Sequence, residues 1–417
     1  MNRKAEMSEN QSTAGANFRK GGTSEHQQRV LDVLDGLGAE AVESEKIGRL
    51  TDETARLLRE SQALRLLGNT DFGGFEAHPV EFIQAAHKIG AVAPSAAWVT
   101  GVVGVHAFEF GQCSPELQAD IWGPNGENPD VWTASPYAPQ GVGKRVDGGY
   151  LLSGHWTFST GCDHSDWFIF GGFVADENGE KLDPPVTKHF VLPTSDGEIL
   201  HDSWQVMGLG GTGSKDVVLK DVFIPEYRAI DAAKMAGGEY ARQYVPEKNY
   251  FRIPQGAMFF SAIHAGTLGI AQGVVDRFEE YTSTRVNPKL GKMAAESPFQ
   301  TRALGMIRAD IAASKAHIIS AVNEYVDHVM RGGEVRPLED SVQLVNIGVR
   351  ATKRAYNAAF EAYQRAGGNA ARLDNPLQRF WRDLCVGMGH VCNVDEPAYQ
   401  DAGLVAVGHE PVNYRRG

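Results

Sequence analysis

The sequence has few cysteines, no block of basic residues and no long apolar run. Its 417 residues include only four cysteines without CxxC spacing, namely Cys113, Cys162, Cys385 and Cys392. This scarcity argues against structural zinc, predicts no metal site and favours reduced thiols, as in a cytoplasm. The net charge is -12, and without a basic block neither nucleic acid nor an anionic membrane is an expected partner. No apolar run reaches the roughly 18 residues of a membrane-spanning helix, so the composition predicts a soluble cytoplasmic protein.

Chain length and residue pattern predict several folded regions. A single core stops growing near roughly 250–300 residues, so this chain should contain two or three domains. Residues 1–25 are rich in Ser, Asn, Lys and Gln, and we expect a disordered tail there that is neither a signal nor an anchor. Changes of periodicity divide the rest into an N-terminal helical domain (26–130), a β-domain (131–235), a four-helix bundle (255–392) and an extended tail (393–417).

The stretch 148–172 is the part of the β-domain that best suits a ligand. Alternating apolar residues and the pair Gly148-Gly149 indicate strands joined by a tight turn. Between two of these strands, residues 157–161 combine hydroxyl side chains with a glycine, whose missing Cβ lets a planar ligand approach the backbone. We interpret this stretch as the floor of a cofactor site, and an ordinary β-hairpin with Ser and Thr at its turns is the alternative.

Two further features each allow two interpretations. The glycine loop 208–213 lacks Walker spacing and a βαβ context, which excludes a phosphate loop and leaves turn chemistry with ligand contact. His106 lies in a nearly all-apolar helix that begins at Pro94-Ser95. A lone histidine in such a helix is usually a satisfied core residue, and only convergence with other polar groups would indicate a substrate contact.

Four motifs carry a resemblance to the acyl-CoA dehydrogenase superfamily. Trp156-Thr-Phe-Ser-Thr-Gly161 resembles its flavin-facing strand turn, and Gly211-Thr-Gly-Ser-Lys-Asp216 resembles its second β-motif. Ala366-Gly-Gly368 resembles its glycine turn, and Gln378-Arg-Phe-Trp-Arg-Asp383 resembles the start of its last helix. The resemblance covers nearly the whole chain, from about His26 to Pro397. It implies an α+β fold with an N-terminal helical domain, a central β-barrel or β-sandwich and a C-terminal four-helix bundle.

The end of the last helix separates the branches of this superfamily. Acyl-CoA dehydrogenases of the common type carry a glutamate base in a Tyr-Glu-Gly-Thr run, a little over two turns after an Arg-Asp pair. This chain has the pair at Arg382-Asp383 but continues to His390 without that run. In this respect it resembles the two-component, flavin-dependent aromatic hydroxylases. An imidazole that titrates near neutrality suits the deprotonation of a phenol or the stabilisation of a hydroperoxyflavin.

The resemblance implies an oxygenase component that works with a separate NAD(P)H-dependent flavin reductase. Reduced FMN or FAD would react with O2 to give a C4a-hydroperoxide, which hydroxylates a phenolic or related aromatic small molecule away from water. Ser159 would then hydrogen-bond flavin N5, and Arg252 would touch the isoalloxazine ring. His390, Ser159 and Arg252 are therefore the predicted catalytic residues. A surface arginine at a domain junction is the alternative for Arg252.

The same resemblance implies further contacts. Helix, strand and terminal helix would each direct a polar group into one apolar pocket, and the predicted substrate contacts are Trp98, His106 and Ser135. The predicted cofactor contacts are Trp156, Thr157, Phe158, Ser159, Arg252, Arg285, Gly367 and Gly368. Arg285 would pair with the flavin phosphate across a subunit interface, and the apolar bundle implies a homotetramer, as is usual in the family.

Two departures and several rival functions stay open at this point. Gly210 stands where many of these hydroxylases have an arginine, and the segment 392–399 is unusual, which bears on phosphate geometry and substrate identity. An acyl-CoA dehydrogenase or flavin oxidase with tightly bound FAD would need a base elsewhere, such as Glu279 or Glu361. A nitrogen- or sulfur-oxygenating monooxygenase would need no phenol base. A non-enzymatic bundle protein would retain only the scaffold.

Overall fold

The N-terminal part of the structure is a group of helices. The computed structural model describes residues 23–287 and 291–413, so the expected disordered tail lies mainly outside the described residues. The helices are α2 (Glu25–Ile47), α3 (Asp52–Ser61), α4 (Pro79–Gly90), α5 (Pro94–Gly104), α6 (His106–Phe110) and α7 (Pro115–Trp122). Prolines begin α4, α5 and α7, where the missing N–H costs no helical hydrogen bond. α5 is apolar almost throughout and is buried from residue 96 to residue 104.

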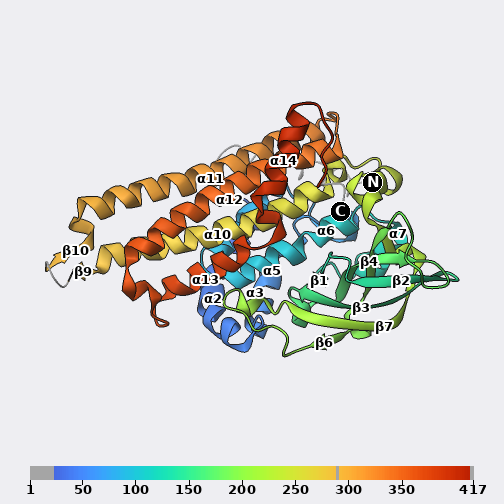
Figure 1. The fold of residues 1–417 in the computed structure, drawn as a ribbon, viewed down its shortest axis with the longest axis horizontal. Helices are drawn as coiled ribbons and strands as arrows, with labels where there is room; N and C mark the ends of the chain where they lie inside the picture. The colour runs from blue at the N-terminus through green and yellow to red at the C-terminus, as the bar shows by residue number, and fades with distance from the viewer. Residues whose placement is uncertain (1–22, 288–290, 414–417) are drawn as a thin grey trace.

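The β-domain is one eight-stranded sheet at the end of the molecule opposite the tip of the bundle (Figure 1). Its strands are β1 (Thr133–Ala134), β2 (Gly141–Val146), β3 (Gly149–Ser159), β4 (Trp167–Ala175), β5 (Thr187–Pro193), β6 (Glu198–Leu200), β7 (Lys215–Pro225) and β8 (Ala229–Asp231). They follow the order β6-β7-β3-β2-β4-β5-β8, and β1 pairs with β4. Large aromatic side chains, among them Trp156, Phe170 and Phe190, fill the core of this domain.

Four helices form the C-terminal bundle, namely α10 (Gln255–Thr284), α11 (Pro298–Met330), α12 (Pro337–Ala366) and α13 (Pro376–Met388). The short helices α8 (Ala232–Ala236) and α9 (Glu239–Tyr244) connect the sheet to α10. α10 is long and apolar enough to cross a membrane, but 83% of its apolar segment is buried within the protein, as in a core helix. A Cβ at Gly269 would meet the His87 carbonyl oxygen at 2.4 Å, so the crossing of α10 and α4 requires glycine. The hairpin of β9 (Val286–Asn287) and β10 (Lys292–Met293) lies at the bundle tip (Figure 1).

The C-terminal segment is helical, so the predicted extended tail at 393–417 is wrong over most of its described part. Helix α14 spans Asp395–Ala406 and packs across α12 (Figure 1). Pro397 and Gly403 suggested irregular structure, but proline is tolerated in the first turn of a helix. Buried Ala398 packs against Val345 and Val349 of α12. Tertiary packing therefore outweighs the low helix propensity of this segment.

Candidate active site

A cavity of about 630 Å³ lies where the N-terminal helices, the sheet and the bundle meet. Its wall comes from α5, the loop 135–140, the end of β3, the segment 204–214, the first turns of α10 and the segment after α13. Within the described part of the chain, no Asp or Glu belongs to this wall. The volume and the largely apolar wall suit a planar small molecule and a reaction protected from water.

Phe158, and not Trp156, reaches the cavity from β3. Trp156 is buried in the sheet core, where it stacks on Phe170 with the ring centroids 4.5 Å apart. Phe158 has a φ of 65°, is 65% exposed and lies edge-on to Trp204. The register of β3 against β7 shifts between Trp156 and Ser159, and such a bulge changes which side chains share a face. The structure thus corrects the predicted cofactor contact of Trp156.

The hydroxyl that reaches the cavity from the end of β3 belongs to Thr160. Its Oγ1 lies 2.8 Å from Ser214 Oγ, which lies 2.8 Å from Thr212 Oγ1, and all three residues line the cavity. Ser159 is fully buried outside the wall, and its Oγ has no hydrogen-bond partner in the described ranges. The predicted Ser159 contact is therefore displaced by one residue. A row of hydroxyls beside the exposed Phe158 ring fits the edge and face of a flavin ring.

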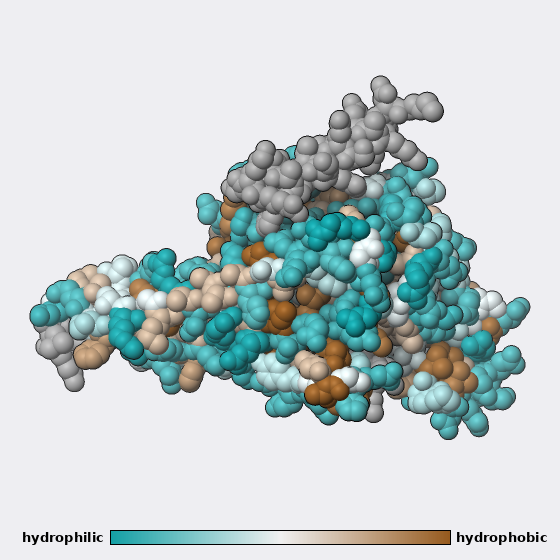
Figure 2. Space-filling model, turned by 90° about the horizontal axis from the view of Figure 1, so that it is seen from above, coloured by the Kyte–Doolittle hydropathy of each residue, from teal (hydrophilic) through white to brown (hydrophobic). Residues whose placement is uncertain are grey.

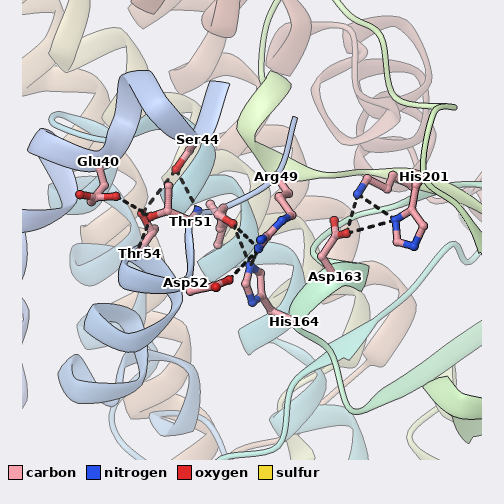
Figure 3. Close-up of polar contacts among 11 residues, drawn as sticks. Glu40, Ser44, Arg49, Thr51, Asp52, Thr54, Asp163, His164 and His201 are labelled. Carbon is pink, nitrogen blue, oxygen red and sulfur yellow. Dashed lines mark hydrogen bonds and ion pairs between the residues drawn. The ribbon is translucent and has the colours of Figure 1, made fainter. Parts of the chain in front are cut away.

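Polar contacts hold the turn that follows β3 (Figure 3). Asp163 pairs with Lys215 of β7, and His201 lies 3.7 Å from the same carboxylate. His164 Nε2 lies 2.9 Å from the carbonyl oxygen of Leu50, in the segment between α2 and α3. The helical region and the sheet therefore fix the row of hydroxyls together.

The last bundle helix positions the glycine loop. Asp383 of α13 accepts the N–H of Leu209 at 2.5 Å, and burial raises the pKa of this carboxyl to about 6. Arg382 donates to Glu45 of α2 at 2.6 Å and to a backbone carbonyl of the loop. A Cβ at Gly208 would lie 2.4 Å from the Arg382 carbonyl oxygen. The Arg-Asp pair is therefore structural, because it clamps the loop against α13.

His390 lies in the cavity wall directly after α13. Its Nδ1 accepts the N–H of Cys392 at 3.2 Å, and its ring lies edge-on to Trp98 with the centroids 5.4 Å apart. Burial lowers the pKa of His390 to about 4, so the ring is neutral near pH 7. A neutral imidazole that accepts at Nδ1 carries its proton on Nε2. In this arrangement His390 offers a ligand a donor. The sequence predicted either a base for a phenol or a group that stabilises a hydroperoxyflavin, and a donor suits the second role.

Side chains of α10 hold the turn that carries His390. His264 Nε2 donates to the Cys392 carbonyl at 2.9 Å, and burial lowers the pKa of His264 to about 4. Asn393 donates from Nδ2 to Thr267 Oγ1 at 3.0 Å and to a carbonyl of α13 at 2.8 Å. The orientation of His390 is thus set by the packing of α13 on α10.

A buried carboxylate organises the wall that contains Ser135. Ser135 lines the cavity, and its Oγ hydrogen-bonds Nε2 of His106, which lies behind it. Nδ1 of His106 is 3.1 Å from Oε2 of Glu109, and Nδ1 of His189 is 3.2 Å from Oε1. Tyr137 donates to the same carboxylate and stacks on His189 with the centroids 4.3 Å apart. The predicted substrate residues His106 and Ser135 therefore lie together.

Four predicted flavin contacts lie outside the cavity of their own chain. Arg252 donates from Nη2 at 2.8 Å to a backbone carbonyl in the turn between α11 and α12. Arg285, which follows α10, donates to the Ala366 carbonyl at 3.1 Å, beside Gly367. Neither arginine belongs to the cavity wall, nor do Gly367 and Gly368. Arg285 directly precedes β9, which lies at the bundle tip away from the sheet (Figure 1), and Gly367 and Gly368 directly follow α12, whose last carbonyl Arg285 binds.

The carboxylates considered for a dehydrogenase lie on the surface of the bundle. Glu279 pairs with Arg308 at 2.8 Å, and Glu361 pairs with Arg365 at 2.9 Å. Neither glutamate belongs to the cavity wall. Among the residues that the structure describes, this cavity therefore has no carboxylate base that could abstract a proton next to a thioester.

Sequence reasoning missed Glu109, Tyr137 and His189, and among the hydroxyls of residues 157–161 it chose Ser159 over Thr160. Glu109 follows His106 by three residues in an apolar segment, a spacing that places both on one helix face, so it carried a readable signal. Tyr137 and His189 come from a loop and a strand that no local pattern brings together. Ser159 was preferred to Thr160 because the bulge in β3, which no local pattern reveals, sets the direction of these side chains.

The chain is similar to known flavin-dependent enzymes over most of its length. Residues 261–394 match the family model described as acyl-CoA dehydrogenase, C-terminal domain. A pigment production hydroxylase of Rhodococcus erythropolis is 39% identical, across 93% of this chain and 98% of its own. The flavin-dependent monooxygenase oxygenase subunit HsaA of Rhodococcus jostii (strain RHA1) is 34% identical, across 89% and 95% respectively. The crystal structure of 3-HSA hydroxylase from Rhodococcus sp. RHA1 matches with a TM-score of 0.86 at 32% identity, covering 94% of this chain and 99% of that one.

Fold and cavity together define a protein of the acyl-CoA dehydrogenase fold whose cavity wall, as far as the structure describes it, contains no carboxylate that could serve as the dehydrogenase base. The chain belongs to the family of flavin-dependent monooxygenase oxygenase subunits. The predicted fold class and family are thereby confirmed.

Proposed function

We propose that this chain is the oxygenase component of a two-component system that hydroxylates an aromatic small molecule, with phenols as the preferred class. When bound, reduced FMN or FAD reacts with O2 and supplies the oxygen atom that enters the ring. One observation carries the proposal. The apolar cavity combines a neutral histidine on one wall with a serine–histidine pair on another and has no acid in its described wall.

The end of β3 and the glycine loop would hold the flavin ring. The exposed Phe158 ring offers a face, while Thr157, Thr160 and Ser214 offer hydroxyls to the ring edge. Thr160 takes the role that was first assigned to Ser159, because only the threonine reaches the cavity. The substrate would lie between this floor and the walls that carry Trp98, Ser135 and His390.

The distant flavin contacts support a homotetramer. Arg285, Gly367 and Gly368 would serve the cavity of another subunit, since they gather at the bundle end. Large apolar side chains are exposed on and next to the bundle helices, at Phe299, Met306, Met330, Phe360 and Leu373. Figure 2 shows apolar patches on an otherwise hydrophilic face, and subunit contact would bury surfaces of this kind. Arg252 would contact flavin only after its guanidinium left the backbone carbonyl that it now binds.

The proposed partner is a separate NAD(P)H-dependent flavin reductase, and the proposed location is the cytoplasm. Net charge of -12 disfavours nucleic acid and anionic lipid. The apolar segment of α10 is mostly buried in the fold, which supports a protein without a membrane partner.

Anaerobic binding of flavin tests this proposal. The purified protein is titrated with oxidised and with reduced FMN and FAD, and then mixed with O2 and a panel of phenols in the presence of a reductase. We expect the reduced form to bind at least about tenfold tighter than the oxidised form and an oxygen atom to appear in the product. Tightly held oxidised flavin that an acyl-CoA reduces would instead establish the dehydrogenase.

A further inference from the structure

Glu109 is a fully buried carboxylate to which three side chains from three segments converge. His106 lies on its own helix, His189 on β5 and Tyr137 in the loop after β1. Burial alone would raise the pKa of Glu109, but hydrogen bonds from the two histidines and their charge lower it to about 2. The carboxylate is therefore charged throughout the neutral range.

The directions of these hydrogen bonds follow from the charge on Glu109. A carboxylate only accepts, so Nδ1 of His106 presents a proton to Glu109, and whenever the ring is neutral its Nε2 presents a lone pair to Ser135. Burial and the neighbouring Glu109 raise the pKa of Tyr137 well above its usual value, so Tyr137 remains a donor. His390 has the reverse arrangement, because its Nδ1 accepts a backbone N–H.

Besides His106 and His189, the titratable groups around Glu109 are neutral. The Cys113 thiol lies 3.5 Å from the Glu109 carbonyl oxygen, and burial raises its pKa well above its usual value. Burial also raises the pKa of Tyr240 on α9 to about 12. From α10, uncharged Gln255 and Phe259 face Tyr137. Glu109 is therefore the carboxylate that faces both His106 and His189, and it balances positive charge that develops on His106.

We propose that Ser135, His106 and Glu109 form the proton-accepting side of the cavity and that Glu109 is the positioning residue that fixes this direction. The inference deepens the proposed function, on which it rests. The hydroxyl of a bound phenol gives its proton to Ser135 Oγ while Ser135 gives its own to His106 Nε2. The phenol O–H bond breaks, an N–H bond forms, and the resulting imidazolium and phenolate are held by Glu109 and by donors in the cavity. Tyr137 and His189 anchor the carboxylate.

The ionisation of a bound chromophoric phenol tests this assignment without turnover. The probe is 4-nitrophenol, whose phenolate absorbs at a longer wavelength than the phenol, titrated into the full-length protein without flavin across a range of pH. 4-Nitroanisole, the methyl ether of the same ring, controls for binding and folding. We expect Glu109→Gln to reduce the ratio of bound phenolate to bound phenol at a given pH by about tenfold or more, the effect of one charged hydrogen bond, while binding of the ether is unchanged.

A second variant keeps the test decisive if Glu109→Gln does not fold. Tyr137→Phe preserves the ring stacked on His189 but removes a hydroxyl that donates to Glu109 and lies 3.0 Å from Nδ1 of His106, so that each of these two groups loses a competing partner. Glu109 then holds His106 more strongly, and the ratio of bound phenolate to phenol should rise by a few-fold. A lower ratio of bound phenolate to phenol in Glu109→Gln and a higher ratio in Tyr137→Phe support proton transfer through Ser135, His106 and Glu109, which we call the relay. A lower ratio in Tyr137→Phe overturns it.

The remaining outcomes separate the relay from the proposed function. An unchanged ratio in Glu109→Gln, together with loss of phenolate in His390→Asn, would make His390 the acceptor and overturn the relay alone. If neither 4-nitrophenol nor 4-nitroanisole binds to the wild-type protein, the phenol class itself fails, and the relay fails with it.

Discussion

Two histidines, His390 in the cavity wall and His106 behind it, carry the same ring in opposite settings. His390 receives a backbone N–H at Nδ1 and is neutral because burial lowers its pKa to about 4. His106 directs Nδ1 to the charged Glu109 and Nε2 to Ser135. The partner of Nδ1 thus decides whether the other ring nitrogen donates or accepts. This difference divides the cavity into a donor wall and an acceptor wall.

Replacing each histidine by asparagine should give the largest effect and test this division directly. At 106, Asn keeps a donor for Glu109 but leaves nothing beside Ser135; at 390, Asn keeps an acceptor for Cys392 but removes the Nε2 proton. We expect His106→Asn to slow hydroxylation of a phenol about 100-fold or more, as for loss of a general base. His390→Asn should cost about tenfold, as for one hydrogen bond.

Product formation is measured with reductase in excess, and binding of reduced flavin and the thermal unfolding temperature serve as controls. Both variants should bind reduced flavin like the wild type, because neither position belongs to the β3 floor. A greater loss of hydroxylation in His390→Asn than in His106→Asn would mean that His390, and not His106, accepts the proton.

The free energy of unfolding should depend on pH differently for His390 on one wall and Glu109 on the other. The folded pKa of His390 is about 4, below the usual value of about 6.5. The unfolded chain therefore binds a proton that the folded chain lacks, and the free energy of unfolding falls as pH drops from about 6.5 to about 4. Glu109, with a pKa of about 2, contributes stability that is present above about pH 4.3 and is lost as pH falls toward 2.

His390→Asn should therefore flatten the decline between pH 6.5 and 4 by about 1–3 kcal/mol. Urea unfolding of both proteins at several pH values measures this, with His264 as a background common to both, since burial lowers its pKa to about 4 as well. An equal decline in the two proteins would show that residue 390 titrates normally in the folded state.

The order of the domains could be predicted from sequence because each domain has its own periodicity. Long amphipathic helices and alternating strands are local patterns, and α5 was recognisable as buried from its apolar residues alone. α14 could not be recognised, since its helix depends on packing against α12. The fold was thus readable wherever local pattern and tertiary contact agree.

The site could be predicted only in part. His390 and Ser135 line the cavity as expected, because short motifs mark them. Thr157 and Phe158 also line it as expected. The direction of a side chain after a β-bulge is not encoded in alternation, so Trp156 was assigned as well, and Ser159 was chosen where Thr160 reaches the cavity. Tyr137 and His189, which meet His106 at Glu109, escaped notice for a different reason, because they come from a loop and a strand far from His106 in the sequence.

Replacing the hydroxyls of Thr160 and Ser159 one at a time should have a smaller effect, on the binding of reduced flavin. Thr160→Val removes an oxygen that lines the cavity, whereas Ser159→Ala removes one that has no partner in the described structure. We expect Thr160→Val to weaken binding of reduced flavin by about threefold to tenfold, as for one hydrogen bond, and to raise the hydrogen peroxide released per O2 consumed. Ser159→Ala should leave both unchanged. A change in Ser159→Ala with none in Thr160→Val would restore the original assignment.

Replacing Asp383 should give the smallest effect. Its contribution to the free energy of unfolding should change with pH in the direction opposite to that of His390. Burial raises its folded pKa to about 6, above the usual value of about 3.9, so the folded chain binds the extra proton and stability is lost as pH rises from about 4 to 6. Asp383→Asn keeps an acceptor for the Leu209 N–H and removes the buried charge. The free energy of unfolding of this variant should exceed that of the wild type by up to about 1 kcal/mol at pH 8 and should equal it at pH 4. A loss at pH 8 would mean that attraction to Arg379 and Arg382 outweighs burial, and that the clamp on the glycine loop requires the charge.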